Sequence, residues 1–148
     1  MSKKILFIFL FYIFSIFHVF AQIHNIQFER ITIKDGLSEV VVASILQDDK
    51  GFLWFGTQDG LNLYDGKSFK IYRPNFHEPL QSVSSPSIQA IIEDSDKNLW
   101  LGSINGLNKY DRKTDRFYHF FHDEDNPNTI SHNRINALTE DSNKNIWI

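Results

Sequence analysis

Short apolar segments separated by polar turns follow one another through most of the chain, and their order repeats. Each repeat begins with an apolar-rich segment, which is followed by an acidic turn, a short segment around a Trp, an Asp-Gly or Asn-Gly hairpin signal and two further apolar segments. Segments this short, bounded by turn residues, predict β-strands, and four in succession predict a small antiparallel sheet. The expected strands are residues 40–46, 52–57, 61–64 and 69–72 in the first copy, 87–92, 99–103, 107–110 and 117–121 in the second, and 134–138 and 146 onward in the third.

The repeat has a nearly constant period. Residues 54–65 read WFGTQDGLNLYD, residues 100–111 read WLGSINGLNKYD, and a third copy begins with the IWI of residues 146–148. A period of about 40 to 50 residues with a Trp-Gly signature is typical of a β-propeller blade, and propellers have about four to eight blades. The sequence therefore predicts an all-β fold, an incomplete β-propeller of about two and a half four-stranded blades.

Residues that recur in every copy are expected to build the blade rather than to bind a ligand. Side chains alternate along a strand, so Trp54 and Gly56 face the same side. We expect the Trp to pack against the neighbouring blade and the Gly to leave room where another chain segment comes close. The predicted structural residues are Trp54, Gly56, Gly60, Leu61, Tyr64, Trp100, Gly102, Gly106, Leu107, Tyr110 and Trp147.

The N-terminal residues predict an export signal. A basic start is followed by an apolar run over residues 5–17, and Val19 and Ala21 place small residues at a signal-peptidase site. A retained membrane anchor is the alternative, but a spanning helix needs roughly 20 apolar residues, and this segment is shorter and contains His18. The expected division is a signal-peptide helix at 1–21, an N-terminal strand segment at 22–36, blades at 37–83 and 84–130, and a truncated blade at 131–148.

The segment before the first blade also alternates. Ile26, Phe28, Ile31 and Ile33 are spaced well enough to predict a strand over residues 26–33. No blade precedes this strand in the sequence, so we expect it to complete the last blade of a closed propeller.

Composition excludes several classes of function. The formal net charge is −3, and no basic stripe or cluster of Lys and Arg occurs, so nucleic acid is not an expected partner of this chain. The chain has no Cys, which excludes disulfides, thiolate zinc sites and a Cys nucleophile.

The acidic turn, Trp strand and hairpin of residues 48–65, with the approach DGLS at residues 35–38, closely resemble the two-component regulator propeller repeat. The resemblance covers residues 26–148. It implies the periplasmic sensor of a Bacteroidetes hybrid two-component system, in which propellers precede a β-sandwich, a membrane helix, and kinase, receiver and DNA-binding domains. Such proteins are anchored in the inner membrane and typically sense oligosaccharides. The kinase and receiver motifs do not occur in these residues, so we expect no enzymatic activity from this chain.

The linkers between copies hold the candidate ligand residues. Loops at one end of a propeller form its ligand surface, as loops in general carry function. Planar donors and an aromatic face suit a sugar, although an ordinary surface loop is the alternative for each residue. The candidates are Arg73, Asn75, Phe76, His77, His132 and Arg134.

Two patterns resemble metal sites but are better explained otherwise. Asp94, Asp96 and Asn98 have the opening spacing of a calcium loop, but the Gly and Glu that such a loop needs are replaced, which favours a solvated hairpin. His119 and His122 are three apart on an expected strand, where they face opposite sides. We predict no metal, no cofactor and no catalytic residue.

The sequence therefore predicts the periplasmic, ligand-sensing propeller portion of a two-component regulator that responds to oligosaccharides. Its expected partners are an oligosaccharide, the remaining blades and downstream signalling domains of a longer protein, and a second copy in a full-length dimer. One alternative is an exported, lyase-like propeller enzyme, which would need a non-repeating set of His and Glu at one end. Another is a secreted interaction module without signalling.

Overall fold

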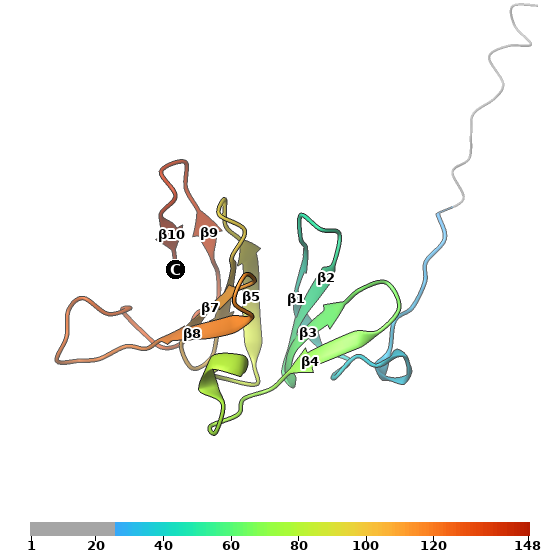
Figure 1. The fold of residues 1–148 in the computed structure, drawn as a ribbon, viewed down its shortest axis with the longest axis horizontal. Coiled ribbons are helices and arrows are strands. Elements are labelled where there is room, and N and C mark those ends of the chain that lie inside the picture. The colour runs from blue at the N-terminus through green and yellow to red at the C-terminus, as the bar shows by residue number, and fades with distance from the viewer. Residues whose placement is uncertain (1–25) are drawn as a thin grey trace, which may run out of the picture. The chain divides into compact units, whose positions relative to one another are not determined.

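A computed structural model describes residues 26–148, and the compact unit Ile31–Ile148 contains all of the strands described here (Figure 1). Two 3-10 helices, η1 (Ile33–Asp35) and η2 (Pro79–Gln81), are the only helices among these residues, and neither is long enough to cross a membrane. The predicted signal peptide at residues 1–21 lies outside the described residues.

The first blade is a four-stranded antiparallel sheet whose strands pair in chain order. The β2–β3 register ends with Thr57 opposite Gly60, so the hairpin loop is the two residues between them. Gly60 has a φ of +107°, and a Cβ at this position would lie 2.5 Å from the carbonyl oxygen of Tyr72, so only glycine fits. The strands are β1 (Val42–Gln47), β2 (Leu53–Thr57), β3 (Gly60–Tyr64) and β4 (Phe69–Tyr72).

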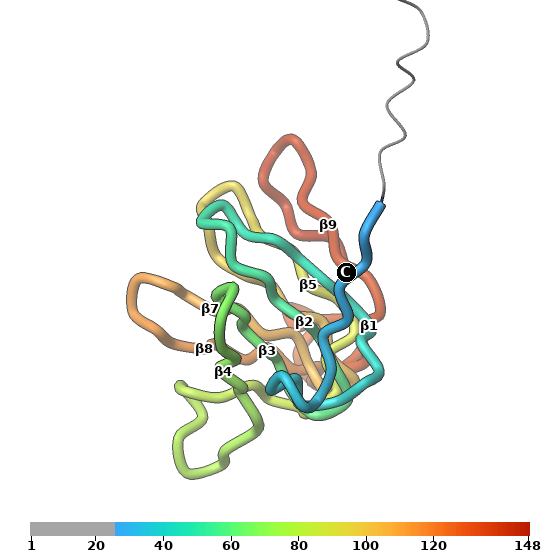
Figure 2. Tube along the Cα trace, turned by 90° about the vertical axis from the view of Figure 1, so that its right-hand side faces the viewer, coloured from blue at the N-terminus to red at the C-terminus, as the bar shows by residue number. Residues whose placement is uncertain are grey.

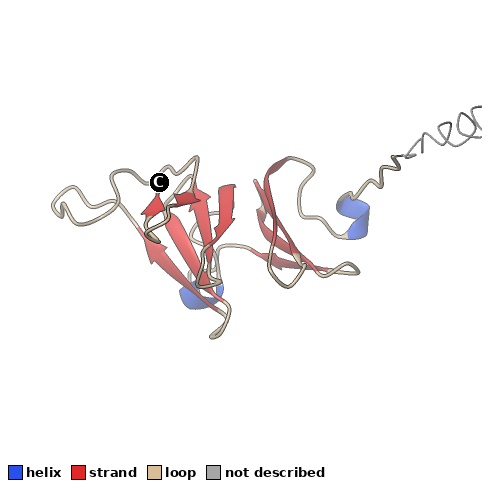
Figure 3. Ribbon diagram, turned by 90° about the horizontal axis from the view of Figure 1, so that it is seen from above, coloured by secondary structure: helices blue, strands red, loops and turns tan. Residues whose placement is uncertain are grey.

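The second blade repeats this arrangement, and a third begins after it (Figure 3). Even the irregularity at the start of the innermost strand recurs, between Val42 and Ser44 in β1 and between Ile88 and Ala90 in β5. The predicted all-β, incomplete propeller is therefore confirmed. The strands are β5 (Ile88–Glu93), β6 (Leu99–Ser103), β7 (Leu107–Asp111) and β8 (Arg116–Phe120) in blade 2, and β9 (Thr139–Glu140) and β10 (Ile146–Trp147) in blade 3.

Two strand predictions need correction. Residues 26–32 are irregular, and the end of the predicted 26–33 strand belongs to η1. Ile26 and Phe28 are exposed, and no described strand pairs with them. Residues 134–138 are likewise not a strand, because the pairing in blade 3 joins only Thr139 and Glu140 to Trp147 and Ile146. An apolar alternation forms a strand only where a partner strand satisfies its backbone groups.

The main core lies between blades 1 and 2. Trp54 of β2 is 2 % exposed and contacts the rings of Tyr72 and Tyr110, with centroid distances of 6.2 and 5.6 Å. Burying an aromatic side chain of this size contributes on the order of 3 kcal/mol. Gly56 lies directly opposite Ile88 of the next blade, and a Cβ at Gly56 would be 3.0 Å from both the Cγ2 and the carbonyl oxygen of Ile88. The missing side chain therefore lets the two sheets approach closely.

The antiparallel order places the connections at two opposite ends of the blades. One end, here called the linker end, carries the β2–β3 and β6–β7 hairpins and the two linkers, residues 73–87 and 121–138. The other, the turn end, carries the β1–β2, β5–β6 and β9–β10 turns and the β3–β4 and β7–β8 turns. Figure 2 shows the β1–β2, β5–β6 and β9–β10 turns together at the top and the first linker at the bottom.

Candidate ligand-binding site at the linker end

The residues that precede each blade are anchored by a buried Asn on the third strand. Asn62 accepts a hydrogen bond from the backbone N–H of Ser38 at 2.9 Å, and Asn108 accepts one from Ser84 at 2.7 Å. Both Asn side chains are fully buried. The Asn62 Nδ2 also donates to the Ser38 hydroxyl at 2.8 Å, whereas the Asn108 Nδ2 has no hydrogen-bond partner among the described residues. The Leu-Ser or Val-Ser before each blade thus fixes where the linker ends and the innermost strand begins.

The first linker folds over the gap between blades 1 and 2. Asn75 accepts a hydrogen bond from the backbone N–H of His77, at 3.0 Å, and Ser82 donates its hydroxyl to the Asn75 carbonyl oxygen, at 3.2 Å. Near the end of the linker, the backbone N–H of Gly60 donates to the Pro86 carbonyl oxygen at 2.6 Å. These bonds give the linker a defined shape with η2 at its centre.

Arg73 begins the linker and is tied to the adjacent hairpin. Its guanidinium donates two hydrogen bonds to Asp59, Nε to Oδ1 at 3.0 Å and Nη2 to Oδ2 at 2.7 Å. These hydrogen bonds from Arg73 lower the pKa of the Asp59 carboxyl. Both side chains are about half exposed, so the pair contributes little stability, but it orients the start of the linker.

A pocket of about 160 Å³ lies between the first linker and blade 2. His119 of β8 forms one wall, and its Nε2 donates to the Ser82 carbonyl oxygen at 2.9 Å. Phe76 is 93 % exposed at the rim, and the His119 and Phe121 rings meet edge to face. The lining residues are Pro74, Asn75, Phe76, Pro79, Ser82, Val83, Ser84, Asn105, His119 and Phe121. The pocket thus combines aromatic faces with a few polar groups, which is the usual make-up of a small-molecule site.

The structure brings only some of the candidate residues together. Asn75 and Phe76 line this pocket, while Arg73 and Asn75 line a larger cleft beside it. His77 is exposed on the same linker and lines neither. His132 and Arg134 lie on the second linker, where the His132 Nδ1 accepts from the backbone N–H of Arg134 at 2.9 Å. They are not part of the pocket between blades 1 and 2.

Sequence reasoning did not identify His119, Phe121 and Asn105 as pocket residues. His119 and Phe121 were assigned to a strand, and Asn105 to a hairpin, and each assignment is correct apart from Phe121, which follows β8. Their shared position emerges only when blade 2 packs beside the first linker. The sequence offered one signal for them: the end of β8 does not alternate strictly between apolar and polar residues, as a core strand would.

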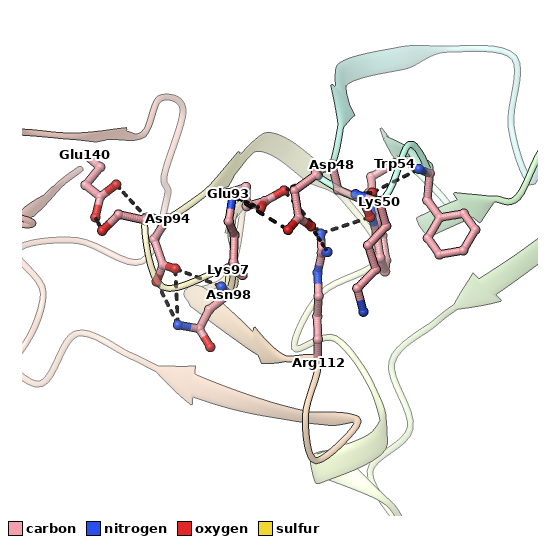
Figure 4. Close-up of polar contacts among 12 residues, drawn as sticks. Asp48, Lys50, Trp54, Glu93, Asp94, Lys97, Asn98, Arg112 and Glu140 are labelled. Carbon is pink, nitrogen blue, oxygen red and sulfur yellow. Dashed lines mark hydrogen bonds and ion pairs between the residues drawn. The ribbon is translucent and has the colours of Figure 1, made fainter.

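The turn end is built from an Asp–Trp pair in every copy, and Figure 4 shows the pair of blade 1. In blade 1, Asp48 accepts from the Trp54 Nε1 at 2.7 Å and from the backbone N–H groups of Lys50 and Phe52, both at 2.9 Å. The indole of the Trp donates in the same way to Asp94 in blade 2, at 2.8 Å, and to Asp141 in blade 3, at 2.9 Å. The recurring acid therefore closes the turn and is not available for catalysis or for a calcium ion.

The tight turns of blades 2 and 3 place a Lys in the left-handed region. Lys97 and Lys144, not the Asn residues that follow them, have the positive φ values, +70° and +66°. Asn98 and Asn145 instead donate their side-chain amides to the turn carboxylates Asp94 and Asp141. This second interaction outweighs the ordinary preference of Asn for the left-handed region.

Successive turns are bridged by the residue that ends each innermost strand. Glu93 accepts from the backbone N–H of Asp49 at 3.0 Å, and Glu140 accepts from that of Ser95 at 2.8 Å. In both cases the carboxylate belongs to the later blade and the amide to the earlier one.

Arg112, from the β7–β8 turn of blade 2, adds a bridge that blade 1 lacks. Its guanidinium lies 2.9 Å from Asp48, 3.0 Å from Asp49 and 3.4 Å from Glu93, and 5.9 Å from the centre of the Trp54 ring. The Arg112 side chain is 10 % exposed and that of Asp48 only 1 %. The corresponding position in blade 1 is Gly66, so the equivalent bridge is absent there.

The described residues contain no metal-ligand cluster, and two His rings there bond to the backbone. No group of three or more His, Asp and Glu side chains there is arranged to hold a metal ion. The His119 and His122 rings hydrogen-bond to backbone carbonyl groups, at Ser82 and Ile130. Neither ring pairs with a hydroxyl group that would act as a nucleophile.

Comparison with known proteins agrees with the repeat. The family model for the two component regulator propeller matches residues 36–59, 82–105 and 129–148. Each matched stretch begins at the end of a linker or of the segment before blade 1 and includes the Trp of its copy, and the first two continue to the hairpin after that Trp. Three stretches of the chain thus match this repeat. The resemblance predicted from residues 48–65 is therefore confirmed.

The repeats also match individual proteins. Histidine kinase P4 of Formosa agariphila is 54 % identical over 55 residues, which is 37 % of this chain and 4 % of the kinase. The extracellular domain of the hybrid two component system BT3049 from B. thetaiotaomicron superposes with a TM-score of 0.74 at 30 % identity, over 80 % of this chain and 17 % of that one. The corresponding domain of BT4673 gives 0.60 at 27 % identity, over 82 % and 17 %. The propeller repeats described here thus span a small part of the proteins they match.

Proposed function

We propose that this chain is the ligand-sensing propeller portion of a periplasmic two-component regulator and that it responds to an oligosaccharide bound at the linker end. Its similarity to extracellular domains of two-component systems supports the sensor role and an export signal at residues 1–21. The observation that carries the ligand assignment is the pocket between the first linker and blade 2, which the exposed Phe76 lines together with His119 and Asn105.

The chemistry of the pocket suits a sugar. An aromatic face packs against the C–H groups of a pyranose ring, and amide and imidazole groups bond to hydroxyls. None of the residues that line the pocket is Asp or Glu. The titratable side chain that does line it, His119, bonds through Nε2 to the Ser82 carbonyl oxygen, which supports a binding role for the pocket.

The position of the pocket suggests how binding is transmitted. One wall is the blade 1 linker and the other is blade 2, so a ligand contacts both. A ligand that prefers one arrangement of these walls shifts the equilibrium toward it. In the longer, dimeric protein this shift is passed on to the downstream signalling domains.

The test is a glycan array probed with the purified, fluorescently labelled chain, followed by calorimetric titration of the glycans that bind. Phe76→Ala is expected to weaken binding about two- to tenfold, the range for one lost aromatic contact. Phe28→Ala is the matched control, because Phe28 is equally exposed, at 92 %, and lies outside both linkers. If no glycan binds, or if the two variants bind alike, the proposed function is wrong.

A further inference from the structure

A second, larger cleft lies on the outer side of the first linker. Blades 1 and 2 pack through their innermost strands, where β5 contacts β1 and β2. The space between the two blades, about 590 Å³, is closed below by η2 and on one side by the β7–β8 turn. Its lining residues are Lys70, Ile71, Tyr72, Arg73, Asn75, Leu80, Gln81, Ser82, Thr114, Asp115 and Arg116. Both blades have all four strands, so this cleft does not depend on the incomplete blade 3.

The charges that line the cleft are unbalanced. Three cations, Lys70, Arg73 and Arg116, face it together with one carboxylate, Asp115. Asp115 is already engaged, because it accepts the Tyr110 hydroxyl at 2.6 Å and lies 3.7 Å from the Lys70 Nζ. Arg116 forms no ion pair with any described residue. Arg73 is also engaged, with Asp59, which does not line the cleft, so the net positive charge of the cleft comes from Arg116.

The floor of the cleft is rigid and polar. The Tyr72 and Tyr110 hydroxyl oxygens are 3.3 Å apart, and the Tyr110 hydroxyl donates a hydrogen bond to Asp115. Burial raises the pKa of the Tyr110 phenol well above its ordinary value, so the group stays a hydrogen-bond donor. Lys70 lies over the Tyr72 ring, with its Nζ 4.5 Å from the ring centre. These contacts hold the Lys70 ammonium at the cleft wall.

We propose that the outer cleft binds the acidic group, a carboxylate or a sulfate ester, of a charged oligosaccharide whose neighbouring sugar occupies the smaller pocket. The two cavities share Asn75 and Ser82, so they form adjoining parts of one site. The smaller pocket alone, at about 160 Å³, is below the range of about 300 to 1,000 Å³ that is usual for ligand sites. Arg116 and Lys70 recognise the acid, since an unpaired guanidinium fits the planar oxygens of a carboxylate or sulfate. This inference rests on the proposed function and narrows the ligand to acidic glycans.

The test compares acidic and neutral glycans on the same array and by titration with the purified chain. Acidic glycans, for example oligogalacturonates or sulfated galactans, are expected to bind more tightly than neutral oligomers of the same length. The double variant Lys70→Gln/Arg116→Gln should weaken their binding about fivefold or more and leave neutral glycans within twofold, because each exposed charge pair contributes up to about 1 kcal/mol. Lys67→Gln, in the β3–β4 turn and outside the cleft, is the matched control.

Four outcomes are distinguishable. A preference for acidic glycans that the double variant removes and Lys67→Gln does not supports the inference. Equal binding of acidic and neutral glycans overturns it and leaves the proposed function intact. Competition by sodium sulfate as strong as by the acidic glycan, at equal ionic strength, shows a simple ion site and also overturns it. Binding of no glycan overturns both proposals.

Discussion

Replacing Arg112 with Ala is expected to weaken the joint between blades 1 and 2 more than any other single surface-turn substitution. The change leaves Asp48, whose side chain is 1 % exposed, without its cation and removes the contact with the Trp54 ring. Removing one partner of a buried ion pair typically costs about 3 to 5 kcal/mol. Asp48 keeps its three N–H donors, and Arg112 is not completely buried, so we expect a loss of about 2 to 3 kcal/mol.

The assay is urea unfolding of the purified chain, followed by Trp fluorescence, because Trp54 lies at this joint. Lys113→Ala is the control: its side chain is exposed, it lies in the same turn, and it should change the free energy of unfolding by less than about 0.5 kcal/mol. Arg112→Lys keeps the positive charge but loses the planar guanidinium, which can bond to two carboxylates at once. Its loss in free energy of unfolding should lie between those of Arg112→Ala and Lys113→Ala. If Arg112→Ala costs no more than Lys113→Ala, the bridge to Asp48, Asp49 and Glu93 does not hold the blades together.

Two further predictions concern blades 2 and 3. Gly102→Ala should destabilise the chain by about 1 to 3 kcal/mol in the same urea assay, because the added Cβ would lie 2.7 Å from the Cγ2 of Ile135. An unchanged urea midpoint of unfolding would show that Ile135 moves away without cost. Hydrogen bonds from the Asn145 and Trp147 side chains lower the pKa of Asp141 to about 2, from an ordinary value of 3.8. Since the folded pKa is depressed, the stabilisation of this turn is fully present above pH 4 and is lost as the pH falls toward 2. Trp147 fluorescence should report this titration, and Asp141→Asn should abolish it; a transition that persists in that variant would contradict the assignment.

The repeat made the blade architecture predictable, because its signals are local. Residues 99–103 and 69–72 form strands with the predicted bounds, and Gly60 and Gly106 have the positive φ values that their hairpins require. The strand expected at residues 26–33 was wrong because an apolar alternation contains no information about whether a partner strand is present. Strand pairing is a long-range property, whereas turn chemistry is read from neighbouring residues.

The candidate site was predictable only in part. Asn75 and Phe76 line the pocket, as expected for linker residues, because the loops at one end of a propeller form its ligand surface. Their role in binding a ligand stays a prediction. His119 and Arg112 were missed because their importance depends on which side chains of another blade they meet. Arg112 is at the position where the first copy has Gly66. When the two copies are aligned, this difference is the sequence signal that singles out Arg112.

The bridges at the turn end have a direction along the chain. The backbone N–H of Asp49 donates to Glu93, and that of Ser95 donates to Glu140. In both bridges an amide of the earlier blade therefore depends on a carboxylate of the later one. Each new blade thus completes the hydrogen bonding of the one before it, so the bridges join the blades in a fixed head-to-tail order.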